Sequence, residues 1–76
     1  MQKVQKVWIS SDSSLGRWLT VDRGIHPIDI AYEFGRAESG EIIRIWDYEN
    51  PDREPDREPD WKVYWDGKEY SFCDRH

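Results

Sequence analysis

Residues 27–40, with the sequence PIDIAYEFGRAESG, decide the fold class of this chain of 76 residues. As a helix, the stretch has Pro27 at the first position, acidic residues early, and Gly40 placed to end it. As a strand, its apolar residues alternate strictly, at Ile28, Ile30, Tyr32 and Phe34. Gly35 costs about 1 kcal/mol inside a helix, but signals at both ends outweigh it. We therefore predict a helix over residues 27–39.

Segments on both sides of this stretch have the apolar alternation or the turn signals of strands. They are residues 4–10, 17–22, 41–48, 61–65 and 68–72. The first two segments flank a polar, turn-forming run and predict a hairpin. The third has apolar residues on both of its faces, so we expect it at the centre of a sheet.

The last two segments flank Asp66-Gly67, a sequence typical of a two-residue hairpin turn. That turn predicts that Val63 lies opposite Tyr70, with Trp61 opposite Phe72. The sequence as a whole predicts an α+β fold, a largely antiparallel sheet of about five strands with one helix on a face. An all-β small barrel, with residues 28–34 as a sixth strand, is the alternative. The chain is too short for two domains, so we expect residues 1–76 to form one.

The net charge of −5 is concentrated in one part of the chain. Residues 47–60 carry two arginines and seven acidic residues, which are Asp47, Glu49, Asp52, Glu54, Asp56, Glu58 and Asp60. Within this stretch, Pro-Asp-Arg-Glu occurs at residues 51–54, again at 55–58, and begins again at 59. Regular prolines and the lack of apolar residues predict an exposed acidic loop over residues 50–60.

Two interpretations of this acidic loop stay open. Its carboxylates can pair with a basic surface on another protein, in the way that phosphates do. Alternatively, the loop is a solvated linker in which the arginines partly neutralise their neighbours. In either case, the negative charge argues against general affinity for nucleic acid, which needs clustered basic residues.

Aromatic residues supply the second surface feature. The chain has five tryptophans, four tyrosines and two phenylalanines, more than a core of this size can enclose. We predict that Trp8, Trp18, Tyr48 and Tyr64 lie on outward faces. Exposed tryptophan and tyrosine are enriched where proteins bind proteins. A second core under the helix, or a dimer interface, is the other explanation.

No catalytic or metal-binding pattern stands out, and we predict neither an enzyme nor a cofactor or metal site. Cys73 and His76 have the spacing of a ligand pair, but only His26 and carboxylates remain to complete four ligands. The glycines stand singly and form no phosphate-binding loop. The single cysteine allows no internal disulfide, and no apolar stretch resembles a signal or a membrane span, so we expect a cytoplasmic protein.

These features together predict a small acidic inhibitor or adaptor that occupies a basic surface of a larger protein, such as a nucleic-acid-binding protein. By analogy of class alone, they are typical of phage or mobile-element blockers of host nucleic-acid machinery, including anti-CRISPR and anti-restriction proteins. We expect no direct contact with nucleic acid or membrane. The alternatives are an aromatic platform that binds single-stranded nucleic acid or glycans, and a homo-oligomeric assembly subunit, for instance a homodimer.

Overall fold

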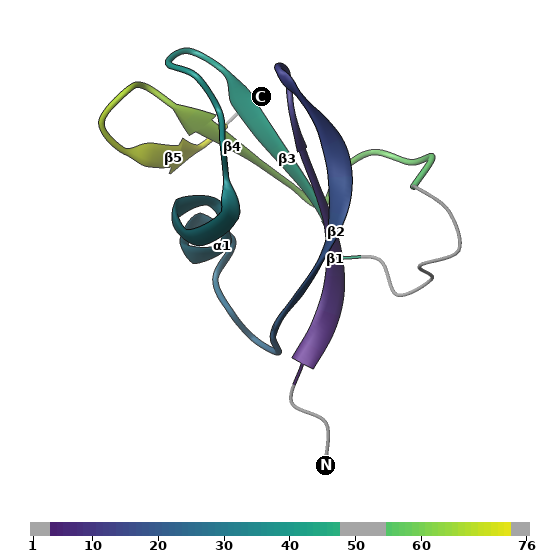
Figure 1. The fold of residues 1–76 in the computed structure, drawn as a ribbon. Helices are drawn as coiled ribbons and strands as arrows, with labels where there is room; N and C mark the ends of the chain where they lie inside the picture. The colour runs from purple at the N-terminus through teal and green to yellow at the C-terminus, as the bar shows by residue number, and fades with distance from the viewer. Residues whose placement is uncertain (1–3, 48–54, 74–76) are drawn as a thin grey trace.

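The computed structural model describes residues 4–47 and 55–73 and contains one antiparallel sheet with a helix against one face (Figure 1). In chain order the elements are β1 (Val4–Ser11), β2 (Ser14–Asp22), α1 (Pro27–Phe34), β3 (Ile42–Asp47), β4 (Trp61–Trp65) and β5 (Tyr70–Phe72). The five strands lie in the order β2-β1-β3-β4-β5. The central position predicted for β3 is confirmed, and so is the α+β class.

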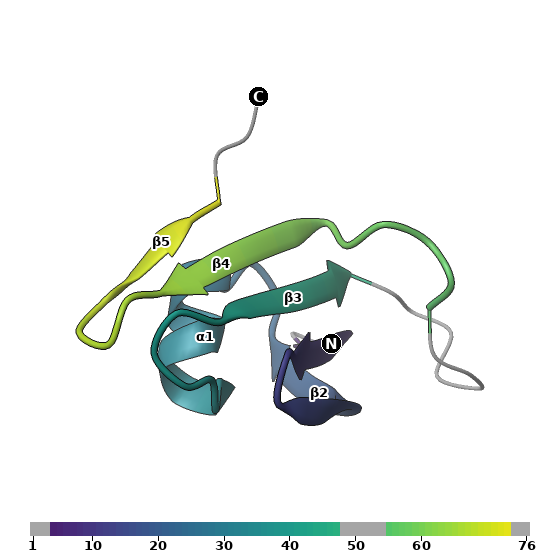
Figure 2. The same cartoon turned by 90° about the horizontal axis from the view of Figure 1, so that it is seen from above.

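The sheet is open, because β2 and β5 lie at its two edges and do not pair with each other. The barrel alternative is therefore wrong, and residues 28–34 belong to a helix instead of a sixth strand. Figure 2, which views the molecule from above, shows the helix lying beneath the sheet. One face of the sheet is thus covered by α1.

Helix α1 begins where the sequence predicts. The Nδ1 atom of His26 accepts the backbone N–H of Ile28 at 3.1 Å, and Pro27 follows at the first helical position. The helix ends at Phe34, however, five residues before the predicted end. Gly40, predicted as the cap, instead has a positive φ of 92° in the turn before β3.

The early end of α1 coincides with a close approach at Gly35. The backbone of this residue is extended, with φ −70° and ψ 148°. A Cβ atom added there would lie 2.4 Å from Cδ1 of Ile43 and 2.9 Å from the hydroxyl of Tyr70. Only glycine lets the chain leave the helix so close to the sheet, and this contact is a tertiary one that helix signals do not contain.

The core lies between α1 and the sheet. It consists of six strand residues and two helix residues, Val7, Ile9, Val21, Ile43, Ile45, Val63, Ile30 and Ala31, all at most 4% exposed. Alternate residues of a strand point to opposite faces, so the strand members of this cluster define the inner face of the sheet. Burial of each valine or isoleucine contributes about 1.5–3 kcal/mol.

The hairpin of β1 and β2 confirms the predicted pairing but is longer than expected. Its turn is tight, because Ser11 pairs with Ser14. The register shifts between this pair and the pair of Ile9 and Arg17, which leaves an extra residue in β2. Leu15, in this bulge, is 91% exposed.

The register predicted for the last hairpin is wrong by two residues. Val63 pairs with Phe72 instead of Tyr70, and Trp65 is the partner of Tyr70. The connection is a four-residue loop in which one Asp66 carboxylate oxygen accepts the backbone N–H groups of Lys68 and Glu69, at 2.7 and 2.9 Å. A shift of two residues preserves the alternation, so the side chains still lie on the faces that the sequence predicts.

Candidate functional site

The face of the sheet opposite α1, here called the open face, is the candidate site. Trp8 lies between the buried residues Val7 and Ile9, and Trp46 follows the buried Ile45. Because strand residues alternate between faces, both tryptophans lie on the open face. Trp18 pairs directly with Trp8 and lies there as well.

These three tryptophans form a continuous row across three strands. Trp18 of β2, Trp8 of β1 and Trp46 of β3 occupy one register position, because Trp8 pairs with the other two on either side. We call them the tryptophan row. The rings of Trp8 and Trp18 meet edge to face, with centroids 5.0 Å apart. Each of the three is half-buried.

The Trp8 indole lies against the backbone of the neighbouring strand at Gly16. A Cβ atom at that position would be 2.3 Å from Nε1 of Trp8. The β2 bulge next to Gly16 thus provides a flat place on which the indole packs. This arrangement explains how a large ring stays half-buried on a face that no helix covers.

The segment of residues 55–60, here called the acidic segment, reaches the same face through Trp46. The indole N–H of Trp46 donates to the backbone carbonyl of Arg57 at 2.7 Å. In Figures 1 and 2 the segment passes on the side of the molecule away from α1. The tryptophan row and the acidic segment are therefore contiguous.

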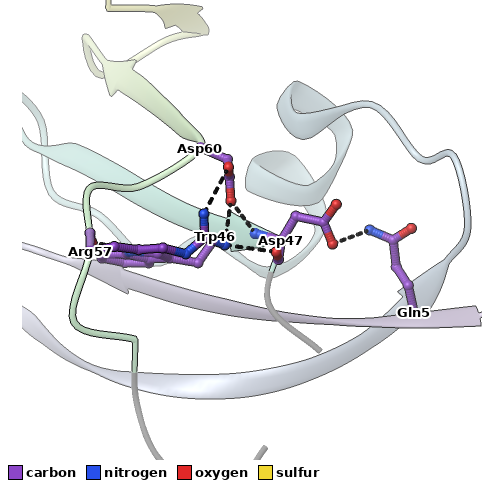
Figure 3. A network of polar contacts seen from close by, with 5 residues as sticks. All are labelled: Gln5, Trp46, Asp47, Arg57 and Asp60. Atoms are coloured by element: carbon purple, nitrogen blue, oxygen red, sulfur yellow. Dashed lines mark hydrogen bonds and ion pairs between the residues drawn. The ribbon is translucent and has the colours of Figure 1, made fainter. Parts of the chain in front are cut away.

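Two polar side chains, those of Arg57 and Asp60, bind the β3 backbone and hold the acidic segment in place (Figure 3). The Asp60 carboxylate accepts the backbone N–H of Asp47 at 2.7 Å and pairs with the Arg57 guanidinium at 3.2 Å. The same guanidinium donates to the Asp47 carbonyl at 2.9 Å, and Gln5 donates to the Asp47 carboxylate at 3.4 Å. We call Asp47, Arg57 and Asp60 the loop anchor.

The acidic residues predicted as binding residues thus divide into three groups. The Asp60 carboxylate is used within the loop anchor, whereas Asp47 takes part through its backbone and its carboxylate accepts from Gln5. Asp56 and Glu58 are exposed and make no hydrogen bond or ion pair with the described residues. Glu49, Asp52 and Glu54, together with the predicted Tyr48, lie outside the described residues.

Tyr64, the remaining predicted aromatic, lies on the open face but apart from the tryptophan row. It pairs with Ile42 and Ser71 and is 38% exposed. Arg44 and Lys62 are direct cross-strand neighbours, and they lie between the pair of Tyr64 with Ile42 and the tryptophan row. The open face therefore places basic residues beside the row, at the end away from the acidic segment.

Arg44 has a partner of its own in the β1–β2 turn. Its guanidinium lies 2.8 Å from the Asp12 carboxylate, which also accepts the backbone N–H of Ile42 at 3.4 Å. The hydrogen bond from Arg44, followed by that from Ile42, lowers the pKa of Asp12 below its usual 3.8. Lys62 makes no such pair with the described residues, so it is the more available cation.

Within residues 4–47 and 55–73, no group of three or more histidine, cysteine or acidic side chains could hold a metal ion. Cys73 is half-buried, and its backbone N–H donates to the Lys62 carbonyl at 2.9 Å, while His76 lies outside the described residues. No helix in the described part of the chain is long and apolar enough to cross a membrane.

Sequence reasoning missed Trp46 and Arg57 as members of the site. Alternation in β3 already placed Trp46 opposite Ile43 and Ile45, but only the pairing of β3 with β1 shows that it extends a row. Arg57 was treated as one member of a charged repeat, and nothing local distinguishes it from Arg53. None of the protein-family models, curated proteins or solved structures compared with this chain matches it.

Proposed function

We propose that this chain is a non-catalytic protein-binding domain that uses the tryptophan row and the acidic segment as one surface. Its partner is a larger protein with a basic surface. The hydrogen bond from Trp46 to the Arg57 carbonyl is the observation that carries the proposal, because it joins the aromatic and the acidic features. Neither feature alone has the composition of a typical interface centre with a polar rim.

The two features have different roles in this proposal. Half-buried tryptophans are already ordered and lose little side-chain freedom on binding, so they provide the anchors that slow dissociation. Asp56 and Glu58 are exposed carboxylates without partners among the described residues, and they provide long-range attraction. Such charges raise the association rate and make it sensitive to salt.

A narrower proposal concerns the class of partner. Proteins that bind nucleic acid have basic surfaces, and a segment of spaced carboxylates is complementary to them. By analogy of class, resting on size and acidity, the chain would block host nucleic-acid machinery in the manner of phage-encoded anti-CRISPR or anti-restriction proteins. Its single thiol supports a reducing compartment such as the cytoplasm.

Capture from an extract of the source cell, followed by mass spectrometry and affinity measurement at several salt concentrations, tests the proposal. The double variant Asp56→Asn/Glu58→Gln is expected to associate more slowly and with a weaker salt dependence. Trp8→Ala is expected to dissociate faster. Asp29→Asn/Glu38→Gln removes the same charge from α1 and the loop after it, and serves as the matched control. Equal affinity of both double variants would contradict the role of the acidic segment.

A second candidate function is favoured by Lys62 and Arg44 beside the tryptophan row. An aromatic platform with adjacent cations suits single-stranded nucleic acid or glycans, where each stacked base contributes about 1–3 kcal/mol. Titration of tryptophan fluorescence with oligothymidylate and with an oligosaccharide separates this function from protein binding, since stacking quenches the signal. Light scattering over a concentration series tests the remaining candidate partner, a second copy of the chain.

A further inference from the structure

The edge strand β2 has a free side. It is the longest strand, with nine residues, and among the described residues its only strand partner is β1. In an antiparallel pair, alternate residues of an edge strand direct their backbone N–H and C=O groups away from the sheet. Native proteins usually protect such an edge, and the bulge at Leu15 and Gly16 does so at the start of β2. Residues 17–22 remain as a template for another extended chain.

A hollow of about 160 Å³ lies beside this edge, between β2 and the last turn of α1. It is lined by Thr20, Val21, Asp22, Ile25, Glu33 and Phe34. Three of these residues are consecutive in β2. The hollow therefore extends along the end of β2 that leads to α1.

The size of the hollow limits what it can hold. Small-molecule sites usually occupy about 300–1,000 Å³, whereas an engineered cavity of about 150 Å³ holds one benzene molecule. The β2 hollow is therefore large enough for one side chain. A peptide that pairs with β2 would bring such a side chain to it directly.

The lining indicates a long side chain with a positive end. Ile25 and Phe34 pack against the core cluster and offer apolar walls. Asp22 and Glu33 are exposed, and their carboxylates make no hydrogen bond or ion pair with the described residues. A lysine or arginine buries its methylene stem on apolar surface and keeps its charged end among polar groups.

The cations near the hollow already have partners, and the Lys6 ammonium donates to the hydroxyl of Thr20 at 3.1 Å. The guanidinium of Arg17 donates to the Phe34 carbonyl, and that of Arg23 donates to the Val4 carbonyl at 3.2 Å. Neither forms an ion pair with Asp22 or Glu33. The two carboxylates thus remain available to a cation supplied by a ligand.

We propose that an extended peptide binds along β2 as a sixth strand and inserts a basic side chain into the hollow beside Glu33. Backbone hydrogen bonds to β2 provide affinity, and the hollow provides selectivity for lysine or arginine at one position. The hollow faces α1, whereas the tryptophan row lies on the open face. The two sites share β2 through Trp18, but this proposal does not rest on the function proposed above.

Selection of a displayed library of random seven-residue peptides on the full chain tests the proposal. The expected result is an enriched sequence with lysine or arginine at one fixed position, flanked by residues that favour strands. The enriched peptide should shift the backbone amide signals of β2 and of the end of α1. Two further versions of the peptide carry N-methyl groups on alternate residues, one version on the odd and the other on the even positions. The version whose methylated N–H groups would pair with β2 should lose binding.

Two matched variants locate the basic side chain. Glu33→Lys is expected to weaken binding by about tenfold or more, because it replaces attraction by repulsion at the hollow. Glu38→Lys makes the same charge change outside the hollow and should leave affinity unchanged. Both positions are exposed, so neither substitution disturbs the core.

Four results would overturn the proposal. They are the absence of an enriched sequence, an enriched sequence without a basic position, amide shifts that leave out residues 19–22 and the end of α1, and equal affinities of the two lysine variants. Concentration-dependent dimerisation that protects β2 amides without peptide would assign the edge to a second copy of the chain, and would also exclude the peptide.

Discussion

The two faces of the sheet differ in what covers them and therefore in what they are made of. The inner face is covered by α1, and its buried strand residues are valine and isoleucine, of which Ile43 and Ile45 are completely buried. Among the described residues no helix covers the open face, and its centre consists of the tryptophan row, Arg44 and Lys62. The described part of the chain has one helix, so its second face must be stable in contact with water.

Tryptophan satisfies that requirement in a way that isoleucine cannot. Its ring shields the strand backbone while its N–H remains able to find a polar partner, as Trp46 does on the Arg57 carbonyl. The comparison indicates that the inner face determines stability, while the open face is available for recognition. Four substitutions or conditions test this division.

The largest expected effect is on the inner face. Ile43→Ala should lower the free energy of unfolding by about 2–5 kcal/mol, comparable with the ~3–5 kcal/mol that one core of this size supplies. The variant should therefore be largely unfolded in water. Ile42→Ala, one residue earlier and half-buried on the open face, is the control. Urea denaturation followed by fluorescence measures both, and similar losses would contradict the division between the faces.

Gly35→Ala should have the next largest effect, about 1–3 kcal/mol of destabilisation by overpacking. Its backbone dihedral angles suit alanine, so the cost arises from the Cβ atom, 2.4 Å from Cδ1 of Ile43 and 2.5 Å from the Ala31 carbonyl oxygen. Adding Ile43→Val removes that methyl group and should recover part of the lost free energy of unfolding, as measured by urea denaturation. A double variant less stable than the sum of the single changes would show that crowding is not the cause.

Gly16→Ala, the corresponding change on the open face, should cost less. The new Cβ would meet the Trp8 indole, which can move aside, so the loss should include the roughly 0.5–1.5 kcal/mol that the aromatic pair contributes beyond ring burial. The circular dichroism of the coupled Trp8 and Trp18 rings should change clearly. Leu15→Ala, at an exposed neighbour, should change neither stability nor the spectrum.

The smallest effect concerns Asp12 in acid. A carboxylate whose pKa is lowered in the folded state stabilises the fold above its unfolded pKa, and that contribution is lost as the pH falls through the folded pKa. With an ordinary value of 3.8, the loss should begin near pH 4 and continue below it. The ion pair with Arg44 is exposed, so the effect is slight. Urea midpoints at pH 6 and pH 2.5 should differ less in Asp12→Asn than in the native chain.

Local signals in the sequence were sufficient for much of the fold. Pro27 marks the helix start correctly, and the apolar content of β3 on both faces predicts its central position. The end of the helix could not be predicted from local signals, because it depends on the approach of Ile43 and Tyr70 to Gly35 across the core. The last hairpin has a four-residue loop instead of the expected two-residue turn, because the Asp66 carboxylate accepts hydrogen bonds from two backbone N–H groups.

The site was less predictable than the fold. Alternation alone placed Trp8 and Trp18 on an outward face, but their alignment with Trp46 depends on two registers between strands distant in sequence. Likewise, composition identified the acidic loop without showing that Asp60 is used to hold it. Such contacts join side chains to backbone groups more than ten residues away, and no local pattern encodes them.

The loop anchor also bears on how this chain can change in length. Arg57 and Asp60 form hydrogen bonds with the backbone of Asp47 at the end of β3. These bonds hold together the two ends of the connection between β3 and β4. The entropic cost of closing a loop rises by only about 0.6 kcal/mol for each doubling of the loop length. Four-residue units inserted or deleted between residues 48 and 55 would therefore leave the sheet nearly as stable as before. The repeat is a place where the protein can gain or lose charge in whole units without refolding, and also where a tag or a second domain can be inserted.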